Sequence, residues 1–302
     1  MKIFMTGGTG FVGTTLTKRL TQKGHRVTLL TRDTSKNRHL PKGASYLEAN
    51  PTEQGTWQER VGEHEVIINL AGASIFRRWT ESSKNAIWNS RILTTQNLVA
   101  ALSARKCRET LFLSTSAVGY YGFYGDEELD EESQPGDDFL ASLSKAWESS
   151  ALNAEESGVN VVLLRFGIVL GKNGGALRQM VPIFNWCMGS PLGSGKQWFS
   201  WIHEEDLANI YLYLLERKDI SGPINCMAPN PVRNEEMTKI LGEVLGSPTF
   251  MPAVPGFIIK IIMGEFGSIL LKGRRVLPKR ILNMGFCFRF PEMREAFQDL
   301  LS

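Results

Sequence analysis

Apolar residues in the first two-thirds of the chain alternate between short continuous runs and longer stretches in which they recur every three or four positions. The continuous runs, each of strand length, span residues 2–5, 27–31, 66–70, 110–115 and 159–166. The stretches with helical spacing span 11–23, 82–104 and 139–157, and the first of them has one apolar stripe formed by Val12, Leu16 and Leu20. Strands that are apolar throughout are buried on both faces, so the pattern predicts an α/β fold with a doubly wound parallel sheet.

The pattern changes after residue 170, where glycine and proline become dense and the alternation weakens. Helical spacing returns at 204–216 and 235–245, and a strand-like run at 223–227. We therefore expect a Rossmann domain over residues 1–170 and a smaller C-terminal α/β lobe over 171–302, with segments near 200–228 returning to the first domain. Aromatic residues at Trp186 and within 197–201 either stack on a flat or sugar-like ligand or form ordinary core.

Composition and charge restrict the class of protein. The 302 residues are 42% apolar and 22% charged, which is typical of a globular chain, and the net charge of +3 gives no bulk electrostatic case for nucleic acid. Six carboxylates fall within residues 126–132, and we expect a solvated loop there. The four cysteines, at 107, 187, 226 and 287, lack metal-ligand spacing, so we predict free thiols and no metal.

No segment of the sequence predicts export or membrane insertion. The apolar run that follows Lys2 is too short for a signal-peptide core. The most apolar stretch, residues 255–271, is interrupted by Lys260 and Glu265, which favours a buried or surface-hugging helix over a spanning one. The expectation is a cytoplasmic protein that binds neither membrane nor nucleic acid.

A glycine-rich loop follows the first predicted strand and opens the first predicted helix. Gly7, Gly10 and Gly13 satisfy the spacing G-x-x-G-x-x-G. Glycine lets the backbone approach a pyrophosphate, and a helix N-terminus offers free N–H groups and the positive end of the dipole. The sequence thus predicts a dinucleotide site built from Gly7, Thr9, Gly10, Phe11, Val12 and Gly13.

The end of the second predicted strand indicates which dinucleotide binds. Sites for NAD usually place an acidic residue about 20 positions beyond the glycine motif, where it accepts from the ribose hydroxyls. Here the strand ends in Thr31 and Arg32, which suit a 2′-phosphate, so NADP(H) is predicted. Asp33 lies one residue later and would favour NAD if the strand ended there, and Arg32 could instead be an ordinary surface charge.

Several further segments resemble the extended short-chain dehydrogenase/reductases, a family that includes nucleotide-sugar epimerases and dehydratases. The matching segments are 7–13, 69–72, 113–116, 165–171 and 201–208. Within that family, the chain is similar to an atypical subgroup called "epimerase family protein", which has its own short C-terminal domain. The subgroup features are segments 119–122, 147–148 and 275–280, with 285–286 following.

The resemblance implies further cofactor contacts. It places Leu70, Ala71 and Gly72 against the adenosine-ribose side of the cofactor, and it adds Ser114 on the strand at 110–115. It also places four residues at the nicotinamide end, namely Phe166, Gly167, Ile168 and Val169. Arg91 stands where the family has an asparagine, and it would reach a cofactor phosphate or an anionic substrate, or else be a helix-surface charge.

The catalytic residues implied by the resemblance are incomplete. Ser116 would hold the substrate oxygen, and Lys145 takes the lysine position of the family's Tyr-x-x-x-Lys, where it would also hold the nicotinamide ribose. The tyrosine position is Ala141, which has no proton to transfer. Tyr120 and Tyr121 are the candidates to replace it, unless they only pack the loop.

The resemblance favours an NADP(H)-dependent oxidoreductase or epimerase-type enzyme acting on a small molecule, sugar-like or carbonyl-bearing, as a monomer or homodimer. Loss of the tyrosine leaves two alternatives open. The first is an NADP(H)-binding regulator without turnover, and the second is a nucleotide-sugar epimerase.

Overall fold

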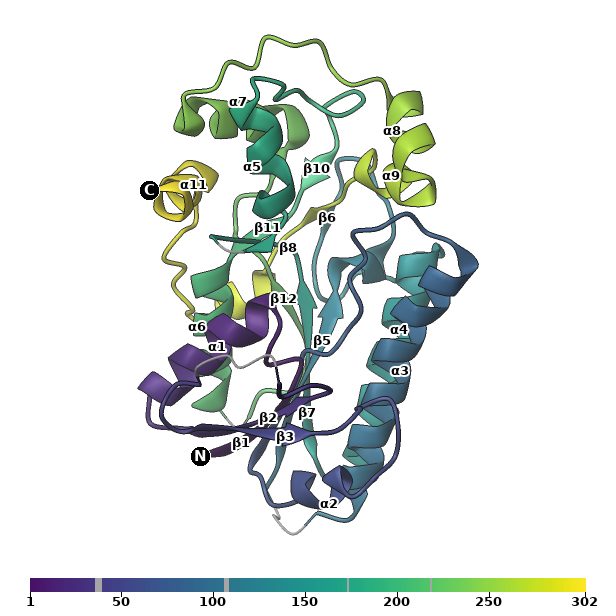
Figure 1. The fold of residues 1–302 in the computed structure, drawn as a ribbon, viewed down its shortest axis with the longest axis vertical. Helices are drawn as coiled ribbons and strands as arrows, with labels where there is room; N and C mark the ends of the chain where they lie inside the picture. The colour runs from purple at the N-terminus through teal and green to yellow at the C-terminus, as the bar shows by residue number, and fades with distance from the viewer. Residues whose placement is uncertain (36–39, 106–108, 173, 218) are drawn as a thin grey trace.

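The protein is built on one central sheet of seven parallel strands (Figure 1). The computed structural model describes residues 1–35, 40–105, 109–172, 174–217 and 219–302. The strand order is β12-β7-β5-β4-β1-β2-β3. Their bounds are β1 Lys2–Thr6, β2 Arg26–Thr31, β3 Ala44–Glu48, β4 Val66–Asn69, β5 Leu111–Ala117, β7 Asn160–Phe166 and β12 Gly222–Cys226.

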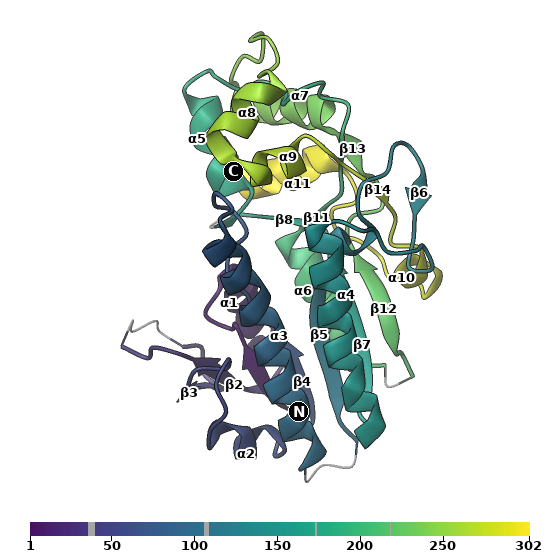
Figure 2. The same ribbon diagram turned by 90° about the vertical axis from the view of Figure 1, so that its right-hand side faces the viewer.

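Helices cover both faces of this sheet (Figure 2). One face packs against α1 (Phe11–Gln22) and α6 (Glu204–Leu215). The other packs against α2 (Trp57–Val61), α3 (Glu81–Ser103) and α4 (Phe139–Leu152). The doubly wound α/β fold expected from the sequence is therefore confirmed.

Successive side chains of a strand point to opposite faces, and β1 shows why its run is apolar throughout. Ile3 and Met5 pack on the α1–α6 side, whereas Phe4 packs on the α2–α4 side, and all three are fully buried. A strand that lies between two helical layers needs an apolar residue at every position.

Two elements differ from the sequence pattern. β3 is half-buried at the edge of the sheet, and its mixed residues gave no continuous apolar run. The helix expected over 139–157 ends as α4 at Leu152 and continues as a 3₁₀ turn, η2 (Asn153–Ser157), which Gly158 closes with a left-handed backbone at φ +72°.

The C-terminal lobe sits at the carboxyl ends of the central strands and has its own apolar core. Its helices are α5 (Leu177–Asn185), α7 (Asn234–Leu245), α8 (Gly256–Met263), α9 (Glu265–Leu270) and α11 (Met293–Leu301). Its short strands are β8 (Ile168–Gly171), β9 (Gly174–Gly175), β10 (Trp198–Phe199), β11 (Trp201–His203) and β13 (Val232–Arg233). No helix in the described ranges is long and apolar enough to span a bilayer.

The acidic segment at 126–132 is largely exposed, as expected, but it is more ordered than a solvated loop. Part of it forms β6 (Glu128–Leu129), which pairs with β14 (Arg275–Val276) just before α10 (Lys279–Asn283). Glu128 forms an ion pair with Arg275 at 3.1 Å, and Asp130 forms one with Lys279 at 2.9 Å. Two of the six carboxylates thus pair with basic residues from the C-terminal part of the chain.

Candidate functional site

The glycine-rich loop folds back on itself at the carboxyl end of β1. Gly7 has a φ of +69°, and a Cβ there would lie 2.6 Å from the carbonyl carbon of Leu70 and 2.8 Å from the Ala71 nitrogen. A Cβ on Gly13 would lie 2.4 Å from the Gly7 oxygen. Only glycine allows this loop to touch the segment after β4, which brings Leu70 and Ala71 beside it.

Gly10 differs from Gly7 and Gly13 because the space that a side chain would occupy there is open. It is the N-cap of α1, with an extended backbone, and a Cβ there would meet only the Gly7 oxygen, at 3.1 Å. The N–H groups of Phe11, Val12 and Gly13 form the first turn of α1, where a helix supplies no acceptor. An exposed backbone with aligned donors fits a pyrophosphate.

Gly10→Ala should therefore remove measurable NADPH binding while the protein stays folded. The methyl group would stand where the pyrophosphate approaches the backbone, yet a φ of −76° suits alanine. Fluorescence titration with NADPH and a thermal melt measure the two effects. The exposed Gly55, where a Cβ meets only the Trp57 ring at 3.4 Å, gives the control Gly55→Ala. Unchanged NADPH affinity in the Gly10→Ala variant would refute the proposal that this loop holds the pyrophosphate.

The end of β2 carries an unpaired cation of the kind that binds a 2′-phosphate. β2 ends at Thr31, which is buried, and Arg32 is exposed and has no hydrogen bond or ion pair with any residue that the structure describes. The Asp33 carboxylate accepts from the Ser35 nitrogen at 2.9 Å and from its hydroxyl at 2.6 Å. The carboxylate that would have favoured NAD is thus held in a turn with Ser35.

Arg91 lies inside the site rather than on the helix surface. Its guanidinium donates to the carbonyl oxygens of Ala73 at 3.1 Å and Ile87 at 3.0 Å, and it lies 5.2 Å from the Trp147 ring. A Cβ on Gly72 would come within 2.9 Å of it. Burial lowers the pKa of Arg91 to about 10. No described carboxylate pairs with Arg91, so this half-buried cation beside the glycine loop suits an anion.

The remaining predicted cofactor residues lie around the same strand ends. Ser114 is buried on β5 beside Asn69 of β4, and its hydroxyl oxygen has no partner among the described residues. The segment from Phe166 to Val169 joins β7 to β8 and is half-buried. Thr9 is half-buried in the loop, and the Phe11 ring packs against Gly171 and Gly174.

A buried hydrogen-bonded network joins α4 to three neighbouring strands of the central sheet. Ser116, Arg165 and Asn225 occupy adjacent positions in register on β5, β7 and β12. Glu148 of α4 accepts from the Arg165 Nε at 2.8 Å and Nη2 at 2.7 Å, and from the Ser116 hydroxyl at 2.6 Å. The hydroxyl of Ser116 is therefore committed to Glu148. Burial alone would lower the pKa of Arg165, but the hydrogen bonds that it donates to the Glu148 carboxylate raise it.

The two candidate tyrosines lie in η1 (Val118–Tyr121) and differ in their surroundings. Tyr121 is fully buried, accepts from Arg165 at 2.9 Å and donates to Asn225 at 2.7 Å. Its burial raises its pKa well above the usual range. Tyr120 is half-buried with its ring 3.5 Å from the Arg165 guanidinium, and its hydroxyl has no hydrogen bond to a described residue. Tyr120 is the tyrosine whose hydroxyl is left for a ligand.

Lys145 lies exposed on α4, and no hydrogen bond or ion pair joins it to another described residue. The face of α4 that carries Glu148 also carries Ser144 and Leu140, which lie nearest to a Cβ built on Gly119 of η1. Lys145 is one position further along the helix, about 100° around its axis, and it is exposed. Ala141 is buried in the same helix. The spacing from Ser116 could not show which face of the helix the lysine would occupy.

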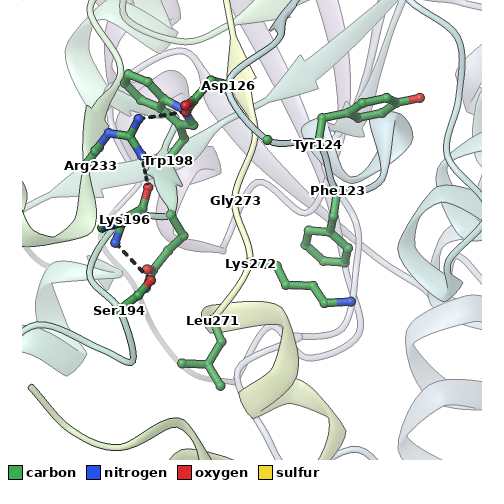
Figure 3. A pocket seen from close by; sticks show the side chains of 12 residues that line it. Phe123, Tyr124, Asp126, Ser194, Lys196, Trp198, Arg233, Leu271, Lys272 and Gly273 are labelled. Carbon is green, nitrogen blue, oxygen red and sulfur yellow. Dashed lines mark hydrogen bonds and ion pairs between the residues drawn. The ribbon is translucent and has the colours of Figure 1, made fainter.

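A cavity of about 380 Å³ opens between the loop that follows η1 and the lobe (Figure 3). Its wall carries three cations and three aromatic rings, namely Lys196, Arg233, Lys272, Phe123, Tyr124 and Trp198. Asp126 pairs with Arg233 at 2.7 Å and accepts from the Trp198 indole at 2.8 Å. The cations outnumber this carboxylate, so the cavity favours an anionic group. Of the other lobe tryptophans, Trp201 is core and Trp186 is exposed.

Three charged residues of this region are not distinguished by the sequence. Glu148 and Arg165 lie within segments that match the family, and Arg274 lies just before the matched segment 275–280. Arg274 is buried, donates to the Val118 carbonyl and lies 4.7 Å from the Phe123 ring, and burial lowers its pKa to about 10. Charged residues are mostly exposed, so nothing in the sequence distinguishes these from surface charges.

Metal-binding groups do not gather here. Within the described ranges, no three His, Cys, Asp or Glu side chains are arranged to hold an ion. Cys187, Cys226 and Cys287 are free thiols, and Cys107 lies outside the described residues.

Comparison with protein families matches residues 3–226 to the model described as "NAD dependent epimerase/dehydratase family". The chain belongs to this family. Residues 254–300 match a second model, DUF1731, a domain of unknown function. The resemblance to extended short-chain dehydrogenases, and to a subgroup with its own C-terminal domain, is thereby confirmed.

Relatives and solved structures agree with the family assignment. The epimerase family protein SDR39U1 homolog, chloroplastic, of Arabidopsis thaliana is 40% identical over 303 residues, covering 100% of this chain and 87% of that protein. The crystal structure of human epimerase family protein SDR39U1 (isoform 2) with NADPH is 33% identical, with a TM-score of 0.85 and 99% of each chain covered. A nucleoside-diphosphate sugar epimerase from Corynebacterium glutamicum is 32% identical, with a TM-score of 0.79, covering 100% of this chain and 58% of that one.

Proposed function

We propose that this protein is an NADP(H)-dependent oxidoreductase or epimerase-type enzyme. The observation that carries the proposal is a glycine cradle flanked by two cations, Arg32 and Arg91, that no described carboxylate neutralises. The human relative was crystallised with NADPH, which supports the same cofactor here.

Each part of the site has a separate task in this proposal. The Gly7–Gly13 loop and the first turn of α1 hold the pyrophosphate, Arg32 holds the 2′-phosphate, and Phe166–Val169 face the nicotinamide end. When bound, NADP(H) supplies or accepts a hydride. Tyr120 supplies or removes the substrate proton, because its hydroxyl alone of the tyrosine pair is not held in the buried network.

The substrate in this proposal enters between the two parts of the molecule and carries an anionic group. The cavity beyond η1, with Lys196, Arg233 and Lys272, supports an anionic group on a carbonyl or sugar-like compound. We also propose that the enzyme works in the cytoplasm as a monomer or homodimer, which free cysteines and a small net charge support.

Arg32→Ala should weaken NADPH binding and leave NADH binding nearly unchanged. The variant removes a charge-assisted hydrogen bond to the 2′-phosphate, which typically contributes about 1.5–3 kcal/mol. Fluorescence titration of both nucleotides measures the difference, and Arg26→Ala, an exposed arginine at the other end of β2, is the matched control. Equal losses for NADPH and NADH would exclude the 2′-phosphate role.

Turnover is tested with a panel of ketones, quinones and nucleotide-sugars followed at the NADPH absorbance band. The enzyme proposal requires NADPH oxidation with at least one compound.

A second candidate function is an NADP(H)-binding regulator. It is favoured by the surroundings of the family's catalytic positions: Ser116 and Tyr121 are hydrogen-bonded to buried partners, and Lys145 is exposed. The regulator hypothesis predicts that NADPH raises the melting temperature and that no compound of the panel is turned over.

A further inference from the structure

Arg274 is a buried cation that neither the nucleotide site nor the network around Glu148 uses. Only 7% of the residue is exposed. Its carbonyl oxygen accepts from the Ser200 hydroxyl at 2.8 Å, which ties this point of the chain, just before β14, to the residue between β10 and β11. Arginine is almost never buried unless it has an anionic partner.

No described carboxylate is that partner. Burial lowers the pKa of Arg274 to about 10, and the charge of Asp138 opposes this effect without forming an ion pair. One Asp138 oxygen accepts from the Ala141 nitrogen at 3.0 Å, and the other has no hydrogen-bond partner among the described residues. Glu128 pairs with the neighbouring Arg275 instead, at 3.1 Å. Arg274 is therefore charged at neutral pH and lacks a counter-charge within the described part of the chain.

The hydrogen bonds of Arg274 leave one edge of its guanidinium for a ligand. Nη1 donates to the Val118 carbonyl at the start of η1, whereas Nε and Nη2 donate to no described residue. These two groups point in one direction as a fork. The same fork of Arg165 donates to the two oxygens of the Glu148 carboxylate, at 2.8 and 2.7 Å. The edge of Arg274 therefore has the geometry that binds one carboxylate.

This arginine lies at the wall of the cavity between the lobe and the loop that follows η1. The Arg274 guanidinium lies 4.7 Å from the Phe123 ring, and the Lys272 ammonium lies 5.0 Å from the same ring. Phe123 and Lys272 both line the cavity, and Figure 3 shows their side chains next to each other. Lys272 is exposed and has no ion pair with a described residue. Two cations without ion pairs thus contact one aromatic ring at this wall.

The acidic side chains around the cavity do not neutralise these two cations. Asp126, which lines the cavity, pairs with Arg233 at 2.7 Å and lies away from Lys272 (Figure 3). Glu235 borders the cavity on the lobe side, and no ion pair joins it to Lys272 or Arg274. A ligand anion therefore meets net positive charge at the wall that carries Phe123.

The same wall adjoins the segment that carries the proposed proton donor. Val118, which orients the Arg274 guanidinium, belongs to the short helix η1 that also contains Tyr120. A carboxylate on the remaining edge of Arg274 is therefore bound beside η1.

We propose that Arg274 binds the carboxylate of the substrate, with Lys272 as the second cation at the cavity wall. The inference rests on the proposed function and names its substrate class: a small carboxylic acid that also bears the carbonyl or hydroxyl group on which the hydride acts. A phosphate has three oxygens and nearly two charges, which a single fork satisfies less well. Arg274 thus determines specificity, because a compound without the carboxylate leaves its buried donors unpaired.

Titration of the full chain with benzoate tests this inference without requiring turnover. The probes are benzoate, its neutral analogue benzamide and phenyl phosphate, each measured by ligand-observed NMR with and without NADPH. Wild-type protein should bind benzoate more tightly than the other two, because only benzoate presents a planar carboxylate to the fork. Arg274→Gln should weaken benzoate binding about 10–100-fold, the usual effect of losing hydrogen bonds to a charged group, and should leave NADPH affinity unchanged.

Two further substitutions separate the fork from charge and from folding. Arg275→Gln is the matched control, since Arg275 is next in the chain and pairs with Glu128, and this variant should bind benzoate like wild type. Arg274→Lys keeps the charge but has no fork, so it should also lose most of the benzoate affinity. Melting curves show which variants are folded, and Arg274→Lys decides the question if Arg274→Gln is not.

Three results would overturn the inference. The first is failure of wild-type protein to bind benzoate more tightly than benzamide. The second is benzoate binding that a folded Arg274 variant retains. The third is tighter binding of phenyl phosphate that Arg274→Gln abolishes, since it would assign the fork to a phosphate.

The proposed function fails by a different result. Benzoate binding that depends on Arg274, in a protein that turns over no compound of the panel, would refute the enzyme and keep the carboxylate site. Turnover of a compound without a carboxylate, with the same KM in wild type and Arg274→Gln, would keep the enzyme and refute the carboxylate site.

Discussion

Glu148→Gln should lower the free energy of unfolding by about 3–5 kcal/mol, because it leaves the buried Arg165 guanidinium without its counter-charge. The two side chains are 7% and 4% exposed and form two hydrogen bonds, so water cannot replace the lost carboxylate. The glutamine keeps the shape of the residue, which limits the change to its charge. Denaturant-induced unfolding measures the loss.

Glu128→Gln is the matched control. Its ion pair with Arg275 has nearly the same composition but is exposed, with side-chain exposures of 44% and 36%. Exposed pairs contribute little, so its loss should cost about 0–1 kcal/mol. Equal losses for the two variants would show that burial of the Arg165–Glu148 pair has no energetic consequence.

Tyr120→Phe should reduce turnover by about 10²–10⁴-fold while NADPH affinity stays the same. The change removes the hydroxyl proposed to exchange the substrate proton, and a positioned acid or base contributes that much. The phenyl ring can still pack on Arg165. Steady-state kinetics with the substrate found in the panel, together with NADPH titration, measure both quantities.

Tyr121→Phe is the informative comparison because it stands next in the chain and loses a different hydroxyl. Its loss removes one buried hydrogen bond from Arg165 and one from Asn225, so the main effect should be on stability. Turnover that survives both changes and disappears only in Ser116→Ala would show that neither tyrosine donates the proton. Restoring the family residue by Ala141→Tyr should not help, since Ala141 is buried in a packed helix.

Local physics allowed the sequence to predict the fold and the nucleotide loop. A strand between two helical layers must be apolar at every position, as Ile3, Phe4 and Met5 are, so the central strands were visible as continuous runs. The Gly7–Gly13 loop was equally visible because only glycine permits its close approach to Leu70. The absence of a carboxylate at Thr31 is a property of one position, and it pointed to NADP(H) without any tertiary contact.

Tertiary structure decided everything that depends on which distant side chains meet. The sequence shows Ser116, Glu148 and Arg165 far apart, and only the registered strands and α4 convert them into one buried network. The rotation of α4 about its own axis decided that Lys145 is exposed, because each residue along a helix turns the side chain by about 100°. The spacing of residues along the chain determines local conformation. Which side chains are buried, and which of them meet, is decided by the packing of segments that lie far apart in the sequence.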